Sequence, residues 1–116
     1  MEETMKKLSY FALLGLFALP AVAAAETFNN VPVVDSNCSK KVADNPDSHT
    51  RACALKCEAS GYGVITGDKK FLKFDAQGNK EIVTALKASD KKDHLRADVT
   101  GEVQGDTLKV TSVKLL

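Results

Sequence analysis

The sequence predicts a mainly β domain of the α+β type, in which short strands are combined with two helices. Three observations support this class. Short segments rich in β-branched and aromatic residues recur between clusters of glycine, proline and aspartate. One segment, 95–103, alternates strictly between apolar and polar residues, which is typical of a half-buried strand. Two other segments combine helix-compatible residues with signals for a helix start or a helix end.

The first strand is expected at 31–36, where β-forming valines precede the polar residues 35–37. Pro32 places this segment at a strand end or at a sheet edge, because proline cannot donate a ladder hydrogen bond. The stretch 37–47 is polar and rich in helix and strand breakers. We therefore expect a loop after the first strand.

A helix is expected at 48–60. Ser48 is a good N-cap residue, and Asp47 is an alternative cap. The residues that follow tolerate a helix, and Gly61 suits the position just after a helix C-terminus.

Two strands are expected at 62–66 and 70–74, joined by the turn 67–69 in a β-hairpin. A turn at 75–79 then leads to a short helix at 80–88. That helix is predicted from the apolar residues that fall on one helical face, which are Ile82, Val83 and Leu86.

The last two strands are expected at 95–103 and from Leu108 onward, with a turn at 104–107. In the final strand the apolar alternation changes phase at Thr111 and Ser112. This change predicts a β-bulge, which bends a strand as closure of a barrel requires.

The predicted order is strand, helix, strand, strand, helix, strand, strand. Without the first helix, this is the connectivity of an OB-fold, a small Greek-key barrel of five strands. We therefore expect one OB-like domain over 26–116. Its cysteine-bearing helix would be an insertion between strands one and two, and its short helix would lie between strands three and four. A small α+β sandwich with the same elements is the alternative.

Residues 1–25 are expected to be a secretory signal peptide that is excluded from the fold. Lys6 and Lys7 form a positively charged start, residues 8–19 form a short apolar run, and small residues follow at a spacing that suits cleavage. The run is shorter than the roughly 20 residues that cross a membrane. The mature chain, 26–116, is then expected in the periplasm or outside the cell, without a membrane anchor.

The charge balance bears on the partners. The chain has 16 basic and 15 acidic residues, which gives a formal net charge of +1. A balanced charge provides no basic surface for nucleic acid or anionic lipid. The sequence also shows no phosphate-binding loop and no paired carboxylates. We therefore expect a monomeric, non-enzymatic module without a cofactor, which binds a small ligand or an envelope partner protein.

The chain contains three cysteines, Cys38, Cys53 and Cys57. An exported chain meets an oxidising compartment, and a small domain gains stability from a disulfide. A link between Cys53 and Cys57 is disfavoured, because residues four apart on a helix have Cβ atoms about 5–6 Å apart and a disulfide needs about 3.5–4.5 Å. In an OB-like barrel the end of strand one lies beside the start of strand two. This favours a Cys38–Cys57 disulfide over the alternative Cys38–Cys53 link, and Cys53 is then the free thiol.

A metal site is the alternative role for the cysteines. Thiolates suit zinc or copper(I), and the three cysteines together could bind such an ion, with His49, His94 or a small molecule as the fourth ligand. A regular helix works against this set, because His49 and Cys57 would lie about 12 Å apart along its axis. Thiol redox chemistry is a third reading, although C-x-x-x-C departs from the usual C-x-x-C motif.

OB-like barrels often bind ligands on the face of strands two and three. Here that face offers Tyr62, Phe71 and Phe74 as a candidate stacking surface. In the alternative interpretation the two phenylalanines fill the core and Tyr62 lies at its rim.

The mature chain resembles a group of small exported bacterial proteins of unknown function. Three motifs carry the resemblance: D-x-x-C at the end of the first strand, a C-x-x-x-C helix that ends in glycine, and a closing hairpin, here VTGEVQGDTLKV. The resemblance covers nearly all of the mature chain. It implies an OB-like domain and implies no activity.

We predict that the chain is exported and cleaved so that its mature N-terminus is Glu26, within about two residues, because the small residues before it suit signal peptidase. N-terminal sequencing of the protein from the host envelope fraction checks this. An uncleaved chain held in the membrane by residues 8–19 would contradict it.

Overall fold

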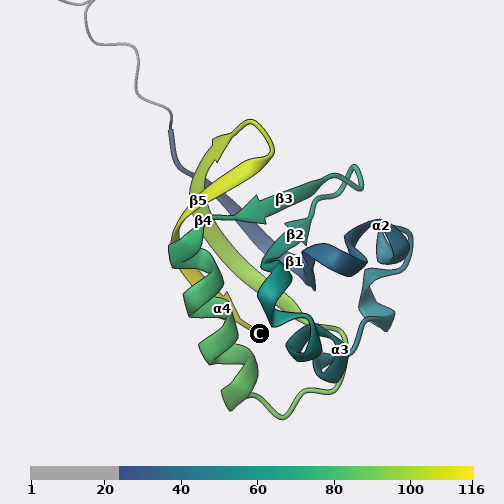
Figure 1. The fold of residues 1–116 in the computed structure, drawn as a ribbon. Helices are drawn as coiled ribbons and strands as arrows, with labels where there is room; N and C mark the ends of the chain where they lie inside the picture. The colour runs from purple at the N-terminus through teal and green to yellow at the C-terminus, as the bar shows by residue number, and fades with distance from the viewer. Residues whose placement is uncertain (1–23) are drawn as a thin grey trace, which may run out of the picture.

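Five strands form a closed barrel in the computed structural model, which describes residues 24–116 (Figure 1). The strands are β1 (Glu26–Asp35), β2 (Tyr62–Ile65), β3 (Phe71–Phe74), β4 (Arg96–Gln104) and β5 (Thr107–Leu115). Their order around the barrel is β1-β2-β3-β5-β4, and β4 closes the barrel by pairing with β1. β3 and β5 run parallel, whereas the other paired strands run antiparallel. The predicted mainly β, OB-like barrel is confirmed.

The predicted signal peptide falls outside the described residues, apart from its last two positions. Within residues 24–116, no helix combines the length and the apolar character needed to cross a bilayer.

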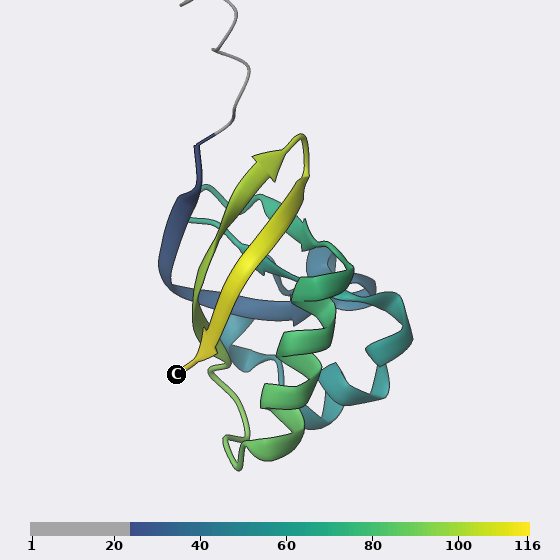
Figure 2. The same cartoon turned by 90° about the vertical axis from the view of Figure 1, so that its left-hand side faces the viewer.

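β1 is longer than expected and serves two partners. Its first half pairs with β4, for example Phe28 with Val99, and its last residues pair with β2, for example Val33 with Val64. The register with β4 shifts between Phe28 and Val31, and Asn30 there has a left-handed φ of 54°. This bulge bends the strand, as Figure 2 shows, so that one strand reaches both edges of the sheet.

A second bulge lies in β5, where the sequence predicts it. Thr100 pairs with Ser112 and Gly101 pairs with Val110, so Thr111 is the extra residue. The Thr111 hydroxyl donates to the Thr100 carbonyl oxygen at 3.1 Å. At Gly101 a Cβ would lie 2.4 Å from the Lys109 carbonyl oxygen, and therefore only glycine allows the two strands to approach this closely.

Helix α4 (Ala76–Ala88) lies between β3 and β4 as expected but begins four residues earlier than predicted. The predicted turn at 75–79 is wrong, because Asp75 is the N-cap and its carboxylate accepts from the Gly78 backbone N–H at 3.0 Å. Gly78 is buried, and a Cβ there would lie 2.6 Å from the Val110 side chain. The glycine is therefore a close contact between helix and barrel and not a turn residue.

The insertion, residues 36–61, connects β1 to β2. It contains short 3-10 turns at Ser36–Cys38 (η1), Pro46–Ser48 (η2) and Glu58–Ser60 (η3), and two short helices, α2 (Ser39–Val42) and α3 (Arg51–Lys56). The predicted loop at 37–47 is therefore partly helical.

The predicted helix at 48–60 is shorter than expected, because Thr50 and not Ser48 is its N-cap: the Thr50 hydroxyl accepts from the Cys53 N–H at 3.1 Å. His49 consequently lies in extended backbone before the helix. Gly61 ends the segment with φ of 80°, as the sequence predicts.

The core lies inside the barrel and under α4 and α3. Its buried side chains are Val33, Ala54, Tyr62, Val64, Leu72, Phe74, Ile82, Leu86, Leu95, Ala97, Val99, Leu108 and Val110. Tyr62 and Phe74 belong to this core, and Phe71 is half-buried. These aromatic side chains therefore form no exposed stacking face. The second reading of the sequence is correct for Phe74, but Tyr62 is fully buried in the core and does not lie at its rim.

We predict that Val99→Asp unfolds the domain, because Val99 is fully buried and a carboxylate there would have no partner. Thr100→Asp places the same charge on the neighbouring, half-exposed position of β4 and should cost far less. Denaturant melts of the two variants check this. Equal losses of stability would contradict the observed phase of the strand.

Candidate metal centre

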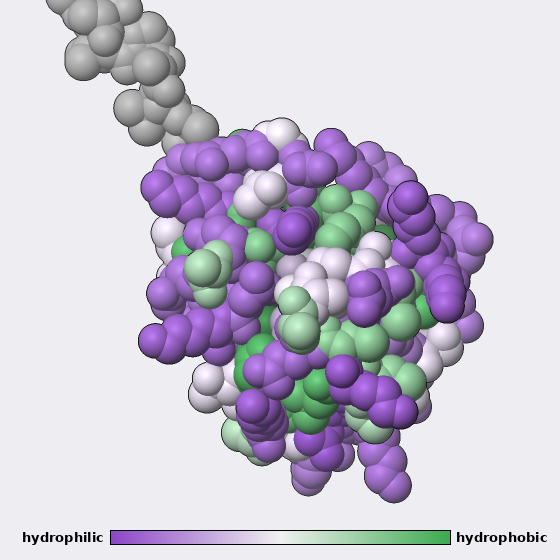
Figure 3. Space-filling view, viewed as in Figure 1, coloured by the Kyte–Doolittle hydropathy of each residue, from purple (hydrophilic) through white to green (hydrophobic). Residues whose placement is uncertain are grey.

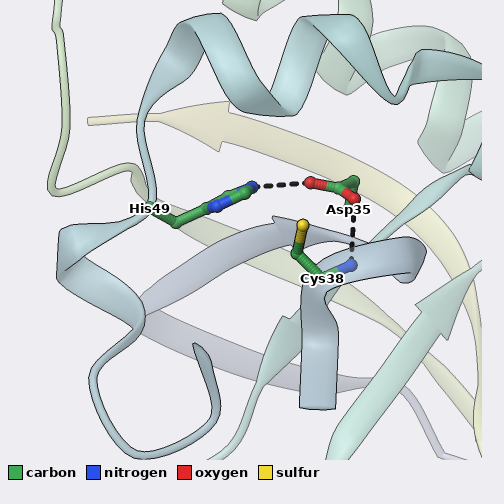
Figure 4. A group of neighbouring side chains, drawn as sticks. All are labelled: Asp35, Cys38 and His49. Carbon is green, nitrogen blue, oxygen red and sulfur yellow. Dashed lines mark hydrogen bonds and ion pairs between the residues drawn. The ribbon is translucent and has the colours of Figure 1, made fainter. Parts of the chain in front are cut away.

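Asp35, Cys38 and His49 come together where the insertion leaves the barrel (Figure 4). Asp35 is the last residue of β1, Cys38 ends η1, and His49 lies between η2 and α3. One ligand atom of each side chain lies within 4.8 Å of the other two. In residues 24–116 this is the one group of three or more such side chains that meets this geometry.

The D-x-x-C spacing creates the first half of the site. Asp35 is the N-cap of η1, and its Oδ2 accepts from the Cys38 backbone N–H at 3.1 Å. A cap of this kind holds the backbone of the residue three positions later against the capping carboxylate. Figure 4 shows the sulfur of Cys38 pointing toward the space between Asp35 and His49.

The imidazole of His49 completes the group. Its Nε2 lies 2.6 Å from Asp35 Oδ1, and the exposed fractions of the two residues are 5% and 0%. A buried carboxylate without partners is strongly destabilising, so this short contact satisfies Asp35. The backbone of His49 is fixed in turn, because its N–H donates to the Pro46 carbonyl oxygen at 3.1 Å.

A second ionic contact holds the segment that carries His49. Arg96 at the start of β4 donates from Nε and Nη2 to the two carboxylate oxygens of Asp47, each at 2.9 Å. The Asp47 carbonyl oxygen also accepts from the His94 backbone N–H at 3.1 Å. The hydrogen bonds from Arg96 lower the pKa of Asp47. Bidentate pairs of this type fix orientation as well as position.

The thiol of Cys38 is not activated for nucleophilic attack. Partial burial first, and then the charge of Asp35 and that of Cys57, raise the pKa of Cys38 above its usual range. A catalytic cysteine needs the opposite shift, toward thiolate at neutral pH. A bound cation would supply the missing positive charge, since metal coordination deprotonates a thiol outright.

The structure places the other predicted ligands elsewhere. Cys53 is exposed on α3, and Cys57 is half-buried just beyond the end of that helix. His94 is exposed, with its Nδ1 2.8 Å from Asp93. Of the metal set predicted from the sequence, Cys38 and His49 are brought together, whereas Cys53 and Cys57 lie outside the group.

The three cysteines are free thiols in the structure, so the predicted Cys38–Cys57 disulfide is not formed in it. That prediction depends on the end of β1 lying beside the start of β2, and the structure shows this arrangement. Asp35 pairs with Tyr62, so the two ends of the insertion meet. The Cys57 charge also acts on Cys38.

Sequence reasoning missed Asp35 as a ligand. A single aspartate at a strand end carries no pairing signal of its own, and its complete burial is visible only in the folded chain. The signal that could have found it is the D-x-x-C spacing, read as a capped turn. That reading would have placed a carboxylate beside Cys38.

The donor types and separations suit a zinc-like ion. Zinc takes thiolate, imidazole and carboxylate ligands at about 2.0–2.3 Å, so the ligand atoms of a tetrahedral site lie about 3.4–3.6 Å apart. The Asp35–His49 contact is shorter than this and would open by about 1 Å. The remaining separations, at most 4.8 Å, would close by about 1 Å. Side-chain rotations can supply both changes.

Comparison of the chain with known proteins gives no significant match to a family model, a curated protein or a solved structure. Its function must therefore be inferred from the fold and from the geometry of this site.

We predict that the Asp47–Arg96 pair stabilises the domain by roughly 0.5–1 kcal/mol at pH 7. Because folding lowers the pKa of Asp47, this contribution is present above the unfolded pKa of about 3.9 and is lost as the pH falls through the folded pKa. Melts of the wild type and Asp47→Asn between pH 7 and pH 2.5 check this, with the exposed Asp90→Asn as control. A stability difference that does not shrink in acid would contradict it.

Proposed function

We propose that this OB-like domain binds a zinc-like divalent metal ion through Asp35, Cys38 and His49. The observation that carries the proposal is the convergence of three different donor types within 4.8 Å at one place in the fold. A carboxylate, an imidazole and a thiolate together suit zinc, whereas copper(I) selects thiolate-rich and thioether-rich sites. In this proposed set Asp35 is a ligand, and Cys53 and Cys57 of the set suggested by the sequence are not.

Two features support a metal site over a purely structural ion pair: the direction of the Cys38 thiol and a buried hydroxyl without a partner. An ion pair that only anchors the insertion needs the carboxylate and the imidazole, and it does not need a thiol directed at both. The buried hydroxyl oxygen of Ser36, next to Asp35, has no hydrogen-bond partner in the described part of the chain. A hydrated metal ion would bring polar partners into this region, because buried polar atoms are normally satisfied.

The ion would join the end of β1, the η1 turn and the segment before α3. Three protein ligands leave a fourth position for water or for an exchangeable ligand. Within residues 24–116 no further histidine, cysteine or acidic side chain joins the group at this separation. We therefore propose a binding role without catalysis, in a protein that is exported to the periplasm or secreted.

A second candidate is the binding of a small organic ligand. An open pocket lies between the bend of β1, the η2 turn and the turn after β2, and its lining includes Asn30, Ile65, Lys69 and Arg96. Both cations are already paired, Lys69 with Asp44 and Arg96 with Asp47. A neutral ligand with hydrogen-bonding groups fits this lining better than an anion. A thermal-shift screen with neutral sugars and amides tests it, and Asn29→Asp, which places a charge at an exposed position of the lining, should reduce any shift.

An envelope partner protein has less support. Stable protein interfaces usually bury a continuous apolar patch. The face in Figure 3 shows only small apolar areas that hydrophilic side chains interrupt. Among the large hydrophobic side chains of residues 24–116, Leu116 is the exposed one.

We predict that the reduced protein binds about one Zn²⁺ per chain, with the ligands named above. Cys38→Ser, Asp35→Asn and His49→Gln should each weaken binding by at least about tenfold, because each removes a donor. Competition with a chromophoric chelator measures the affinity. Co²⁺ substitution gives a direct signature, since a thiolate-to-cobalt charge-transfer band should appear in the wild type and be absent from Cys38→Ser.

Cys53→Ser and His94→Gln are the matched controls, because both residues are exposed and lie outside the group. They should bind zinc as the wild type does. Circular dichroism shows whether each variant is folded, and Cys38→Ser is the mildest change of the ligand variants. A folded Cys38→Ser that binds zinc with wild-type affinity would refute the proposed site.

A further inference from the structure

We propose that Cys38 and Cys57 form a redox pair that opens and closes the metal centre. In the reduced chain Cys38 is a metal ligand, and in the oxidised chain it is bonded to Cys57 and the ion is released. This inference rests on the proposed metal site and adds its regulation by the thiol–disulfide state of the surroundings.

The barrel brings the two cysteines to the same place. Asp35 and Tyr62 are paired across β1 and β2, and the Ser36 N–H donates to the Gly61 carbonyl oxygen at 2.8 Å. The insertion therefore leaves and re-enters the barrel at adjacent points. Cys38 follows the first point by a few residues, and Cys57 precedes the second by a few.

A single hydroxyl connects the backbone at these two positions. Ser60 Oγ accepts from the Asn37 N–H at 3.3 Å and donates to the Cys57 carbonyl oxygen at 2.9 Å. Asn37, which precedes Cys38, and Cys57 therefore both hydrogen-bond through their backbones to Ser60 Oγ. Cys53 is exposed on α3 and takes no part in this contact.

The oxidation is a thiol–disulfide exchange with an external disulfide. One thiolate of the pair attacks that disulfide, forms a mixed disulfide and releases one external thiol. The second thiolate then attacks the chain's sulfur in the mixed disulfide, forms the Cys38–Cys57 bond and releases the second external thiol. Two electrons pass from the pair to the external disulfide, and the two protons lost by the pair end on the two released thiols.

The two states of Cys38 exclude each other. A disulfide sulfur carries no negative charge and cannot serve as the thiolate that zinc requires. After the ion leaves, the Asp35 carboxylate and the His49 imidazole can pair with each other at the 2.6 Å separation that the structure gives them. By linkage, zinc must make the pair harder to oxidise by the same factor by which oxidation weakens zinc binding.

The test uses the purified exported protein, loaded with one equivalent of Zn²⁺ and placed in glutathione buffers of increasing disulfide content. A chromophoric chelator reports zinc release. Intact mass separates an internal disulfide, which loses two hydrogens, from a glutathione adduct, and non-reducing peptide mapping identifies the linked cysteines. Wild type, Cys53→Ser, Cys57→Ser and Cys57→Ala are compared, with circular dichroism to show that each is folded.

We expect wild type and Cys53→Ser to release zinc as the Cys38–Cys57 link forms. Both Cys57 variants should bind zinc when reduced and keep it at glutathione ratios that empty the wild type. Saturating zinc should shift the half-oxidation ratio of the wild type at least about tenfold toward oxidising conditions.

A linked chain that keeps its zinc, a link to Cys53, or Cys57 variants that lose zinc at the wild-type ratio would overturn the switch and leave the metal site standing. Failure of the reduced wild type to bind zinc would overturn the metal site and the switch together.

Discussion

The buried contact between Asp35 and His49 fixes the position of the whole insertion. Asp35 ends a barrel strand and is completely buried, so its carboxylate must be satisfied by groups that come from outside the sheet. The His49 imidazole and the Cys38 backbone N–H are those groups. The insertion has no strand of its own to pair with the barrel. Its placement therefore depends on this contact, on the Asp47–Arg96 pair and on the packing of Ala54.

The candidate centre consequently lies at the boundary between the barrel and the insertion. Asp35 and Cys38 lie at and just after the end of β1, whereas His49 lies further along the insertion, before α3. A ligand set that spans two parts of a fold can couple ion binding to the order of the segment between them, since binding energy and folding energy are then shared. The centre therefore differs in position from the usual ligand face of an OB-fold, which is formed by strands two and three. In this chain the aromatic residues Tyr62 and Phe74 of those strands are buried in the core.

The barrel could be predicted from the sequence because its signals are local. The alternation along 95–103 and the phase change at Thr111 each reflect the backbone that the residues adopt, and the structure shows both. The start of α4 could not be read in this way. Gly78 is present because Val110 packs against it, and that contact exists only after the helix has docked on the barrel.

The candidate site could be predicted only in part, because local signals indicate its residue types and not how they are brought together. Cys38 and His49 stand out as residue types, but placing His49 on a helix turned it toward the wrong neighbours. Thr50 and not Ser48 is the cap, and the first residue of the helix is held by the loop before β4, where the Arg51 N–H donates to the Lys92 carbonyl oxygen at 2.8 Å. Asp35 does not stand out as a residue type. The D-x-x-C spacing is its mark in the sequence, and its complete burial is visible only in the folded chain.

The hydroxyl of Tyr62 donates to the Ala54 carbonyl oxygen at 2.7 Å, and so joins the barrel core to helix α3. Burial, followed by the charges of Glu58, Asp35 and Cys57, raises the pKa of Tyr62 to about 12. The chain has no tryptophan, and its two tyrosines are Tyr10 and Tyr62. In the part of the chain that the structure describes, the ultraviolet absorption and emission of tyrosine therefore arise from one ring. Tyr62 pairs with Asp35 in the barrel, and its hydroxyl contacts α3 of the insertion. The absorption and emission of this ring therefore report on the contact between the insertion and the barrel.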